Sequence, residues 1–252
     1  MANMGSQGMI KHIDDPGITV LSDTAGTGIT WATSNDSGTS PVRAVAAGKG
    51  IHYAGATSAS ATSMTELCSN DLIFTGQEGH SSMEVLLQLD VVTNVAFNFG
   101  FNDDVNDTSN TLPVELSGTT WTSNAATFLG FAFDTDADND ELHCFWVDDD
   151  VDCAATSATL VNGKSLRMTG MAPTAAKWLY MKVEMQDRGS GNGVRATFLA
   201  VDHNGRSVEK VFNTTVDRDC PLCYYLGVEC RGTAAKNIYI KCPNWEQAIA
   251  NM

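Results

Sequence analysis

Four aspartates occupy alternate positions in one short stretch of the sequence. They are Asp134, Asp136, Asp138 and Asp140. Their carboxylates could converge on Ca²⁺ if the chain turns there, because this ion takes roughly six to eight oxygen ligands. The stretch departs from the EF-hand pattern, which requires Gly where Asn139 stands and Glu where Phe145 stands. The alternative is a solvated hairpin tip, since Asp tolerates the backbone geometry of turns. We expect no other cofactor.

No pattern in the sequence indicates a catalytic centre. The acidic residues on expected strands, such as Glu84, Glu184 and Glu229, are isolated from one another in the sequence. The five histidines lie near no serine or acidic motif that would complete a nucleophilic triad. The chain also lacks a Walker-type loop and a dinucleotide-binding glycine fingerprint. We therefore predict that the protein is not an enzyme.

The cysteines are better explained as buried side chains than as a reactive or metal site. There are seven, and an odd count speaks against a complete disulfide framework. Cys220 and Cys223 form a C-x-x-C pair, but a redox dithiol sits at a helix N-terminus and this pair runs into an alternating strand. Zinc would need a second close pair. Cys144 and Cys153 bracket an acidic turn and could face each other across a hairpin.

Charge is unevenly distributed along the chain. The formal net charge is −15, and residues 51–163 contain 18 acidic residues but no Lys or Arg. From Lys164 onward there are 12 basic and 8 acidic residues. We expect so acidic a chain not to bind nucleic acid directly, because phosphate binding depends on clustered Lys and Arg.

The sequence shows no segment that would direct the chain into or across a membrane. No apolar run is long enough for a membrane span, and no secretion signal is evident. We therefore expect assembly in a host cytoplasm.

Alternating polar and apolar residues dominate the sequence from about residue 42. Val95, Phe97, Phe99 and Phe101 share one face of an expected strand, and Thr127–Phe133 repeats the pattern. Such strands pack as two stacked sheets. We expect strands at residues 42–46, 51–54, 72–75, 83–90, 95–102, 112–116, 127–134, 142–147, 165–171, 178–186, 194–202, 207–212, 224–230 and 237–242. Only residues 244–250 suggest a helix.

The first 45 residues differ from the remainder. They contain few large apolar groups and polar runs such as TSNDSGTSP. We predict two parts, an extended N-terminal arm over residues 1–45 and a β-sandwich domain over residues 46–252. We further expect that deleting residues 1–45 weakens association with a particle while leaving the β-domain folded.

The order of several short segments resembles a known fold. The segments are Cys68-Ser-Asn-Asp-Leu-Ile-Phe-Thr-Gly-Gln-Glu-Gly-His, the strand through Phe97 and Phe101, Trp178-Leu-Tyr-Met-Lys-Val-Glu, Ala196-Thr-Phe, Asn204-Gly205, Pro221-Leu, Tyr224-Tyr-Leu-Gly-Val-Glu, Arg231-Gly-Thr-Ala-Ala-Lys and Asn237-Ile-Tyr-Ile-Lys. Over residues 45–243 this order resembles laminin-G or concanavalin-A-like jelly rolls, and in particular those of tailed-bacteriophage virion proteins. The resemblance implies an all-β, antiparallel two-sheet jelly-roll sandwich. Jelly-roll glucanases carry an E-x-D-x-x-E strand, which is absent here.

The resemblance implies a structural protein of a virion. The first hypothesis is a capsid decoration or cement protein that stabilises the head, with the major capsid protein and copies of itself as partners, as a trimer or another symmetric oligomer. The alternative is a tail fibre or adsorption module that binds host-surface glycan, with Trp121, Trp146 and the acidic stretch as candidate contacts. Fold alone does not decide between them.

Overall fold

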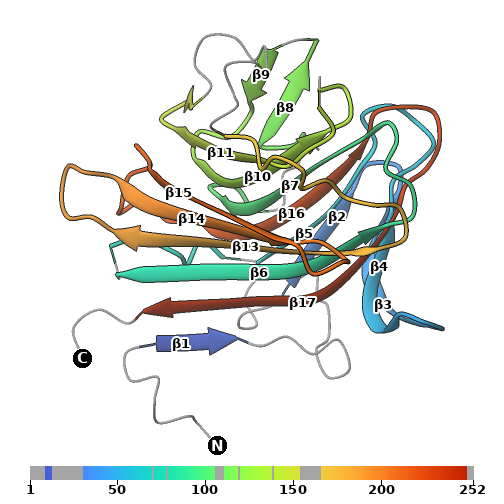
Figure 1. The fold of residues 1–252 in the computed structure, drawn as a ribbon, viewed down its shortest axis with the longest axis horizontal. Coiled ribbons are helices and arrows are strands. Elements are labelled where there is room, and N and C mark those ends of the chain that lie inside the picture. The colour runs from blue at the N-terminus through green and yellow to red at the C-terminus, as the bar shows by residue number, and fades with distance from the viewer. Residues whose placement is uncertain are drawn as a thin grey trace, which may run out of the picture.

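The protein is a stack of two antiparallel sheets. The computed structural model describes residues 9–12, 31–69, 71–77, 79–105, 111–118, 120–137, 139–153 and 166–248, and all regular elements within these ranges are β-strands. Figure 1 shows the two sheets as layers, with a short hairpin above the upper one. The prediction of an all-β, two-sheet sandwich is therefore confirmed.

Eight strands form the lower layer in Figure 1. In spatial order they are β15 (Ser207–Asn213), β14 (Val194–Val201), β13 (Trp178–Asp187), β6 (His80–Leu89), β17 (Asn237–Ala248), β4 (Gly50–Ala56) and β3 (Thr39–Ala46), with β1 (Met9–His12) paired to the C-terminal part of β17. Strands β6, β13 and β17 are its centre, since β6 pairs along its length with both of the others.

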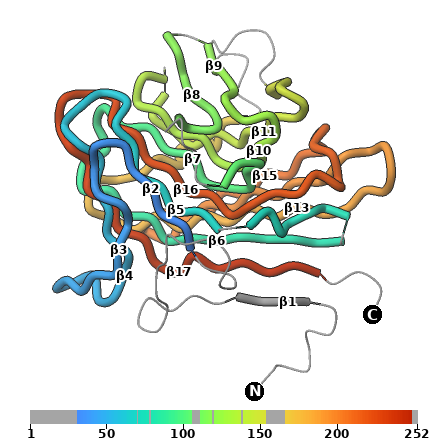
Figure 2. Tube along the Cα trace, turned by 180° about the vertical axis from the view of Figure 1, so that it is seen from behind, coloured from blue at the N-terminus to red at the C-terminus, as the bar shows by residue number. Residues whose placement is uncertain are grey.

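Seven strands form the second sheet. In spatial order they are β12 (Val151–Asp152), β11 (His143–Asp148), β10 (Phe128–Asp134), β7 (Val95–Asn102), β16 (Cys223–Cys230), β5 (Met64–Ser69) and β2 (Trp31–Asn35). The hairpin of β8 (Val114–Ser117) and β9 (Thr120–Ser123) lies over the outer side of this sheet, as the view from behind also shows (Figure 2).

The main core lies between the sheets and is built by strand alternation. Phe97 and Phe133 stack with ring centroids 5.1 Å apart, and their neighbours Phe99 and Phe131 stack at 6.4 Å. Every second residue of the facing strands, such as Val183, completes the same buried cluster. The phenylalanine face predicted from the sequence is thus the inner face of the seven-stranded sheet. Burial of these large rings from water is the main stabilising contribution.

The predicted N-terminal arm is wrong from residue 31 onward. Residues 31–35 form β2 and residues 39–46 form β3, each at the edge of a sheet. Trp31 is buried and meets Tyr224 edge to face, with centroids 4.8 Å apart. The sequence pattern predicted the strand at 42–46 but concealed β2 and the first residues of β3, because edge strands bury few side chains and tolerate polar residues. The remainder of the predicted arm, residues 1–8 and 13–30, lies outside the described residues.

The predicted C-terminal helix is also wrong. Residues 244–248 continue β17, where they pair with β6 on one side and β1 on the other. A short helix is marginal on its own, and these strand pairs outweigh its local preference.

The sequence pattern also missed β5, β9 and β12. Where strands were expected at 72–75 and 165–171, the described residues, 72–75 and 166–171, contain only isolated bridges, at Phe74 and Arg167. None of the described residues forms a helix of the length and hydropathy that crossing a membrane requires.

Candidate functional site

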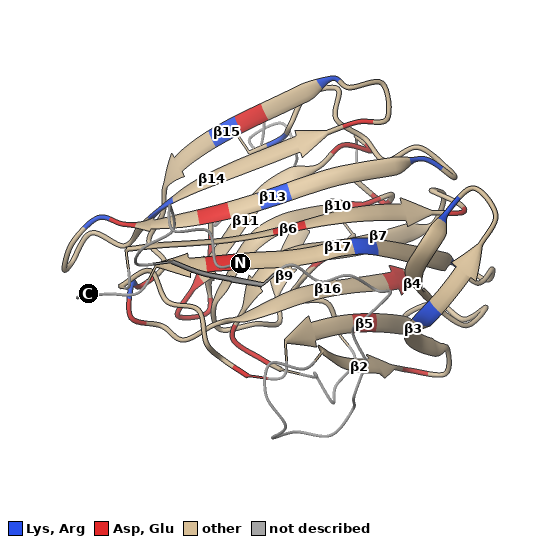
Figure 3. Cartoon of the chain, turned by 90° about the horizontal axis from the view of Figure 1, so that it is seen from below, with Lys and Arg blue, Asp and Glu red and all other residues tan. Residues whose placement is uncertain are grey.

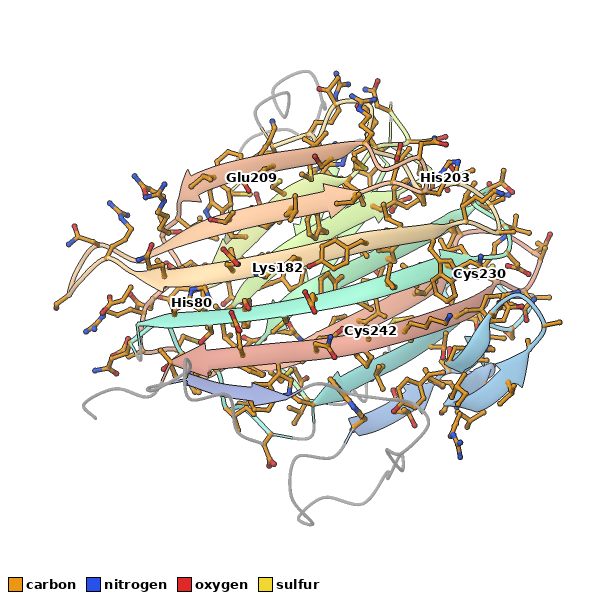
Figure 4. All side chains as sticks on the ribbon, turned by 60° about the horizontal axis from the view of Figure 1, so that its bottom comes forward. His80, Lys182, His203, Glu209, Cys230 and Cys242 are labelled. Atoms are coloured by element: carbon orange, nitrogen blue, oxygen red, sulfur yellow. The ribbon has the colours of Figure 1, made fainter. Side chains whose placement is uncertain are left out.

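The outer surface of the eight-stranded sheet carries an array of polar and aromatic side chains. Along β13, Leu179, Met181 and Val183 point into the core, so the alternate residues point outward. The outward residues of β13, β6 and β17 are called the open face here. Figure 4 looks onto it, with His80 at the start of β6, Lys182 on β13 and Cys242 on β17. Neighbouring strands place side chains of equal register roughly 5 Å apart, so these residues form transverse rows.

Two aromatic side chains flank an amide at one end of the open face. Trp178 of β13 and Tyr239 of β17 both have Gln88 of β6 as their register partner. Lys241 Nζ lies 4.8 Å from the centre of the Trp178 ring, and Lys49 Nζ lies 4.0 Å from that of Tyr239. Both rings are partly exposed. This end therefore combines planar apolar surfaces with two cations.

A hydrogen-bonded cluster occupies the centre of the open face. The Tyr180 hydroxyl donates to Glu84 Oε2 at 2.5 Å, and Asn244 Nδ2 donates to Glu84 Oε1 at 2.9 Å. Burial and the adjacent Glu84 carboxylate raise the pKa of Tyr180, so its hydroxyl stays protonated at neutral pH. Lys182 is the register partner of Glu84 and forms an ion pair with Glu184.

Two of the acidic residues that are isolated in the sequence share one face of the folded sheet. Glu84 and Glu184 lie on adjacent strands and belong to one polar network with Lys182. A further contact, between His80 Nε2 and Glu246 Oε1 at 3.4 Å, extends the polar surface toward the far end of β6. These strands are about 100 and 160 residues apart in sequence, so only the strand order brings the groups together.

A β-bulge on β17 sets which residues reach the open face. Lys241 pairs with Leu86 and Asn244 with Glu84, so β17 uses one residue more than β6 over this interval. Cys242, inside the bulge, has a φ of 49°. The extra residue turns Asn244 outward to Glu84 and Trp245 inward, where Trp245 meets Phe74 with centroids 5.1 Å apart.

Three of the four aspartates proposed for Ca²⁺ are described by the structure, and these three are not grouped around one point. Asp134 is buried, and its Oδ2 accepts hydrogen bonds from Arg231 Nε at 3.1 Å and Nη2 at 2.7 Å. Its Oδ1 accepts the Asp136 backbone N–H at 2.9 Å. Asp136 and Asp140 are exposed, and Asp138 lies outside the described residues. Within the described ranges, no three His, Cys, Asp or Glu side chains are grouped to hold a metal ion. The Ca²⁺ site at this stretch stays a prediction.

Arg231 links Asp134 to a second buried acid. Its Nη1 lies 2.9 Å from Glu229 Oε1. Burial, followed by a hydrogen bond with Glu115, raises the pKa of Glu229 to about 8. The Glu229 carboxyl is therefore largely neutral at pH 7. This cluster joins β10 and β16 to the β8–β9 hairpin and has a structural role.

The remaining sequence candidates are mostly buried. None of the seven cysteines, all within the described ranges, is in a disulfide. Trp121 is only 5% exposed and packs on Phe145, while Trp146 packs against Phe212, so neither is an open platform. His143 is buried, and burial lowers its pKa to about 4. Sequence reasoning missed Trp178 and Tyr239, although their alternation with core residues was a usable signal.

Comparison with solved structures supports the fold. No known protein family and no curated protein matches the chain. A protein of unknown function from Shewanella oneidensis MR-1 is 10% identical with a TM-score of 0.55, covering 97% of this chain and 87% of that one. Peanut lectin is 7% identical with a TM-score of 0.54, covering 97% and 99%. An alginate lyase from Aplysia kurodai is 8% identical with a TM-score of 0.55, covering 91% and 97%. The chain thus has the lectin-like jelly-roll fold that the sequence predicted.

Proposed function

We propose that the protein binds an extended glycan along the open face of its eight-stranded sheet. The observation that carries the proposal is the row of Trp178, Gln88 and Tyr239, with a lysine over each ring. Sugar rings bind proteins by laying their C–H faces on aromatic side chains while amides and charged groups take the hydroxyls. The two lysines favour a carboxylated sugar at this end.

Two further points support this proposal. The rows across β13, β6 and β17 continue from the aromatic end into the cluster around Glu84, so a linear chain of sugars would meet polar partners along its length. Two of the similar structures are a lectin and an alginate lyase, whose names denote the binding and the cleavage of glycans. These structures are similar to this chain in fold only, so the proposal depends on the residues of the open face.

Calorimetric titration with uronate oligosaccharides and with neutral oligosaccharides tests the proposal. We expect the uronate series to bind more tightly. We expect Trp178→Ala to weaken binding about tenfold, which corresponds to about 1.4 kcal/mol of lost contact. Trp178→Phe keeps an aromatic ring and should retain most of the affinity. Equal binding by wild type and Trp178→Ala would contradict the proposal.

One lysine and one arginine provide a matched pair of substitutions that test the role of charge. Lys241→Gln should weaken binding of the uronate series and leave neutral oligosaccharides unaffected. Arg188→Gln removes the same charge from the loop after β13, away from Trp178, and should change neither.

We expect binding without cleavage. Elimination from a uronate needs a base, and the Tyr180 hydroxyl keeps its proton because burial and Glu84 raise its pKa. The same incubations can be followed for the ultraviolet absorbance of an unsaturated product. Its appearance in wild type, and its loss in Tyr180→Phe, would show that the protein is a lyase.

The virion setting remains part of the proposal. Glycan binding suits the predicted adsorption module, in which the protein would sit on a phage tail or fibre. Capsid decoration is the second candidate. Its partners would be the major capsid protein and further copies of the chain, in a trimer or another symmetric oligomer. One observation favours it: the β3–β4 hairpin exposes Val42, Val45 and Ile51, and Val45 is 73% exposed. Val45→Lys would then weaken retention on capsids without affecting glycan binding.

A further inference from the structure

Two hairpins carry the most exposed large apolar side chains of the described residues. Val45 of the β3–β4 hairpin is 73% exposed, and Val151 of the β11–β12 hairpin is 61% exposed. β3 is the last strand of the eight-stranded sheet, and β12 is the last strand of the seven-stranded sheet. Both side chains therefore lie at sheet edges, where a neighbouring molecule can reach them.

The two hairpins lie on opposite sides of the molecule. β2, the other end strand of the seven-stranded sheet, packs beside β3. On the far side β11 meets β15, where the Trp146 and Phe212 rings have centroids 5.4 Å apart. Figure 3 shows β2 and β3 together on one side of the sandwich and β15 on the other. One chain therefore cannot bring these two hairpins into contact with each other.

The β3–β4 hairpin presents a basic and apolar face, and it is called the basic hairpin here. Val45 and Ile51 are register partners, and both are exposed. Strand alternation places Arg43 and the core residue Tyr53 on the same side as these two. The end of the hairpin therefore extends past the second sheet, as Figure 2 also shows. Arg43 is exposed and forms no ion pair with another described residue.

The β11–β12 hairpin presents the opposite charge, and it is called the acidic hairpin here. Val151 is the register partner of Asp148, and Asp149 and Asp150 form the turn between them. Both turn aspartates are exposed, and neither forms an ion pair within the described part of the chain. Burial raises the pKa of Asp148, and the carboxylates of Asp217 and Asp149 act in the same direction. The acidic hairpin therefore combines an exposed apolar side chain with crowded negative charge.

We infer that the basic hairpin of one copy binds the acidic hairpin of a second copy of this chain. Val45 and Ile51 cover Val151, while Arg43 meets the carboxylates of the turn. The partner is a second copy because the chain carries both halves of the contact, with opposite charges beside exposed apolar groups. The contact joins two different surfaces, so every added copy leaves one hairpin of each kind free. Association therefore ends only when a ring closes.

The inference goes beyond glycan binding and does not depend on it. Arg43, Val45 and Ile51 point to the side of the sheet on which the core lies, and the open face is the other side. Pairing of β3 with β3 is the other contact that this edge could make. It would bring two basic hairpins together and leave the acidic hairpin uncovered, so like charges oppose it.

The contact is weak between two copies and stronger in a closed ring. Two hairpin ends bury less surface than a standard interface, which takes about 1,600 Å². In a ring each copy makes two contacts, and the last of them forms at a high effective concentration. We therefore expect a ring of at least three copies at high protein concentration. Salt should dissociate it, because exposed charges are screened.

Disulfide trapping in the full chain tests the inference. Val45→Cys and Val151→Cys are made separately in a chain that also carries Cys242→Ser, which removes the exposed native thiol. The variants are reduced and then oxidised with oxidised glutathione, alone or mixed. We expect a covalent dimer on non-reducing electrophoresis from the mixture and none from either variant alone. Peptide mapping identifies the linked positions, and the chain with Cys242→Ser alone is the control.

Reversal of one charge gives a second measurement. Sedimentation equilibrium of Arg43→Glu should show a dissociation constant raised about tenfold, because the new carboxylate faces the acidic hairpin. Arg188→Glu makes the same reversal in the loop after β13 and should associate as wild type does. Circular dichroism shows whether each variant is folded.

Three results would overturn the inference. One is a covalent dimer from Val45→Cys alone, which would show that β3 pairs with β3. Another is a wild-type chain that stays monomeric up to millimolar concentration, with no linked product from the mixture. The third is association that Arg43→Glu and Arg188→Glu weaken equally, the behaviour of general attraction between charged surfaces. All three are measured without sugars, so each is distinct from a failure of glycan binding.

Discussion

At the scale of single residues, the cluster of Glu229, Arg231 and Asp134 shows how burial changes charge. One guanidinium faces two buried carboxyls, and Glu229 also meets Glu115 on the hairpin. Desolvation is the largest cause of the raised pKa of Glu229, and it also raises the pKa of Asp134, against the attraction of Arg231. The cluster fastens the β8–β9 hairpin to the seven-stranded sheet.

This cluster predicts a loss of stability as pH rises. The pKa of Glu229 is raised from 4.5 to about 8 in the folded chain, so its contribution is full below pH 4.5 and lost as pH rises toward 8. Glutamine cannot ionise, so the stability of wild type relative to Glu229→Gln should fall over this range, by up to about 1.4 kcal/mol per pH unit. Urea unfolding of both proteins at several pH values measures this difference. Parallel pH profiles would contradict the assignment.

The residues of the open face were only partly predictable from the sequence. Alternation along residues 178–187 is visible in the sequence and separates Tyr180 and Lys182 from the core residues between them. Nothing local could show that Tyr180 bonds to Glu84, because the contact depends on β13 lying beside β6. The same holds for Val45, because its exposure depends on where the second sheet ends.

At the scale of elements, central strands were predicted well and edge strands poorly. Strands β7, β10, β13 and β16 have strongly alternating or continuously apolar sequences, so their bounds agree with expectation within one or two residues. Strand β2 is polar apart from Trp31 and Ala32, and the C-terminal half of β17 has a helical pattern. Their strand conformation is imposed by neighbours that are distant in the sequence.

The place of β2 in the sheet predicts where the chain can be shortened. Removal of residues 1–45 deletes β2 with its buried Trp31 and most of β3, so we expect no cooperative thermal unfolding. Removal of residues 1–30 deletes only β1 from the described strands and should leave a cooperative transition. Comparison of the two truncated proteins therefore distinguishes the effect of removing residues 1–30 from unfolding of the sandwich. A cooperative transition in the shorter chain would show that β2 is dispensable.

At the scale of the whole molecule, charge separates along the chain and across the fold. The stretch without Lys or Arg contains β7, β10 and β11 of the seven-stranded sheet, whereas the later, more basic part supplies β13, β14, β15 and the C-terminal β17. Figure 3 shows Lys and Arg interspersed with acidic residues on the eight-stranded sheet. The net charge of −15 therefore coexists with local cations beside Trp178.

This distribution predicts discrimination between two kinds of anion. A short uronate needs only one or two cations and a ring to stack on, whereas duplex DNA needs many basic contacts along its backbone. We expect the protein to bind uronate oligosaccharides and not to shift DNA in gel electrophoresis at physiological salt. A DNA shift comparable to the uronate affinity would indicate general attraction to polyanions.

The bulge at Cys242 gives the count of residues between Ile240 and Trp245 a diagnostic value. A related chain with one residue fewer in that interval could pair with β6 as a regular strand and still keep its tryptophan on the core and its asparagine beside Glu84, because the bulge is that one extra residue. A chain with two residues fewer would turn both side chains to the opposite faces. Homologues could therefore be sorted by this interval before any is purified. Those of unchanged length need the bulge, those one residue shorter do not, and both should retain the central cluster.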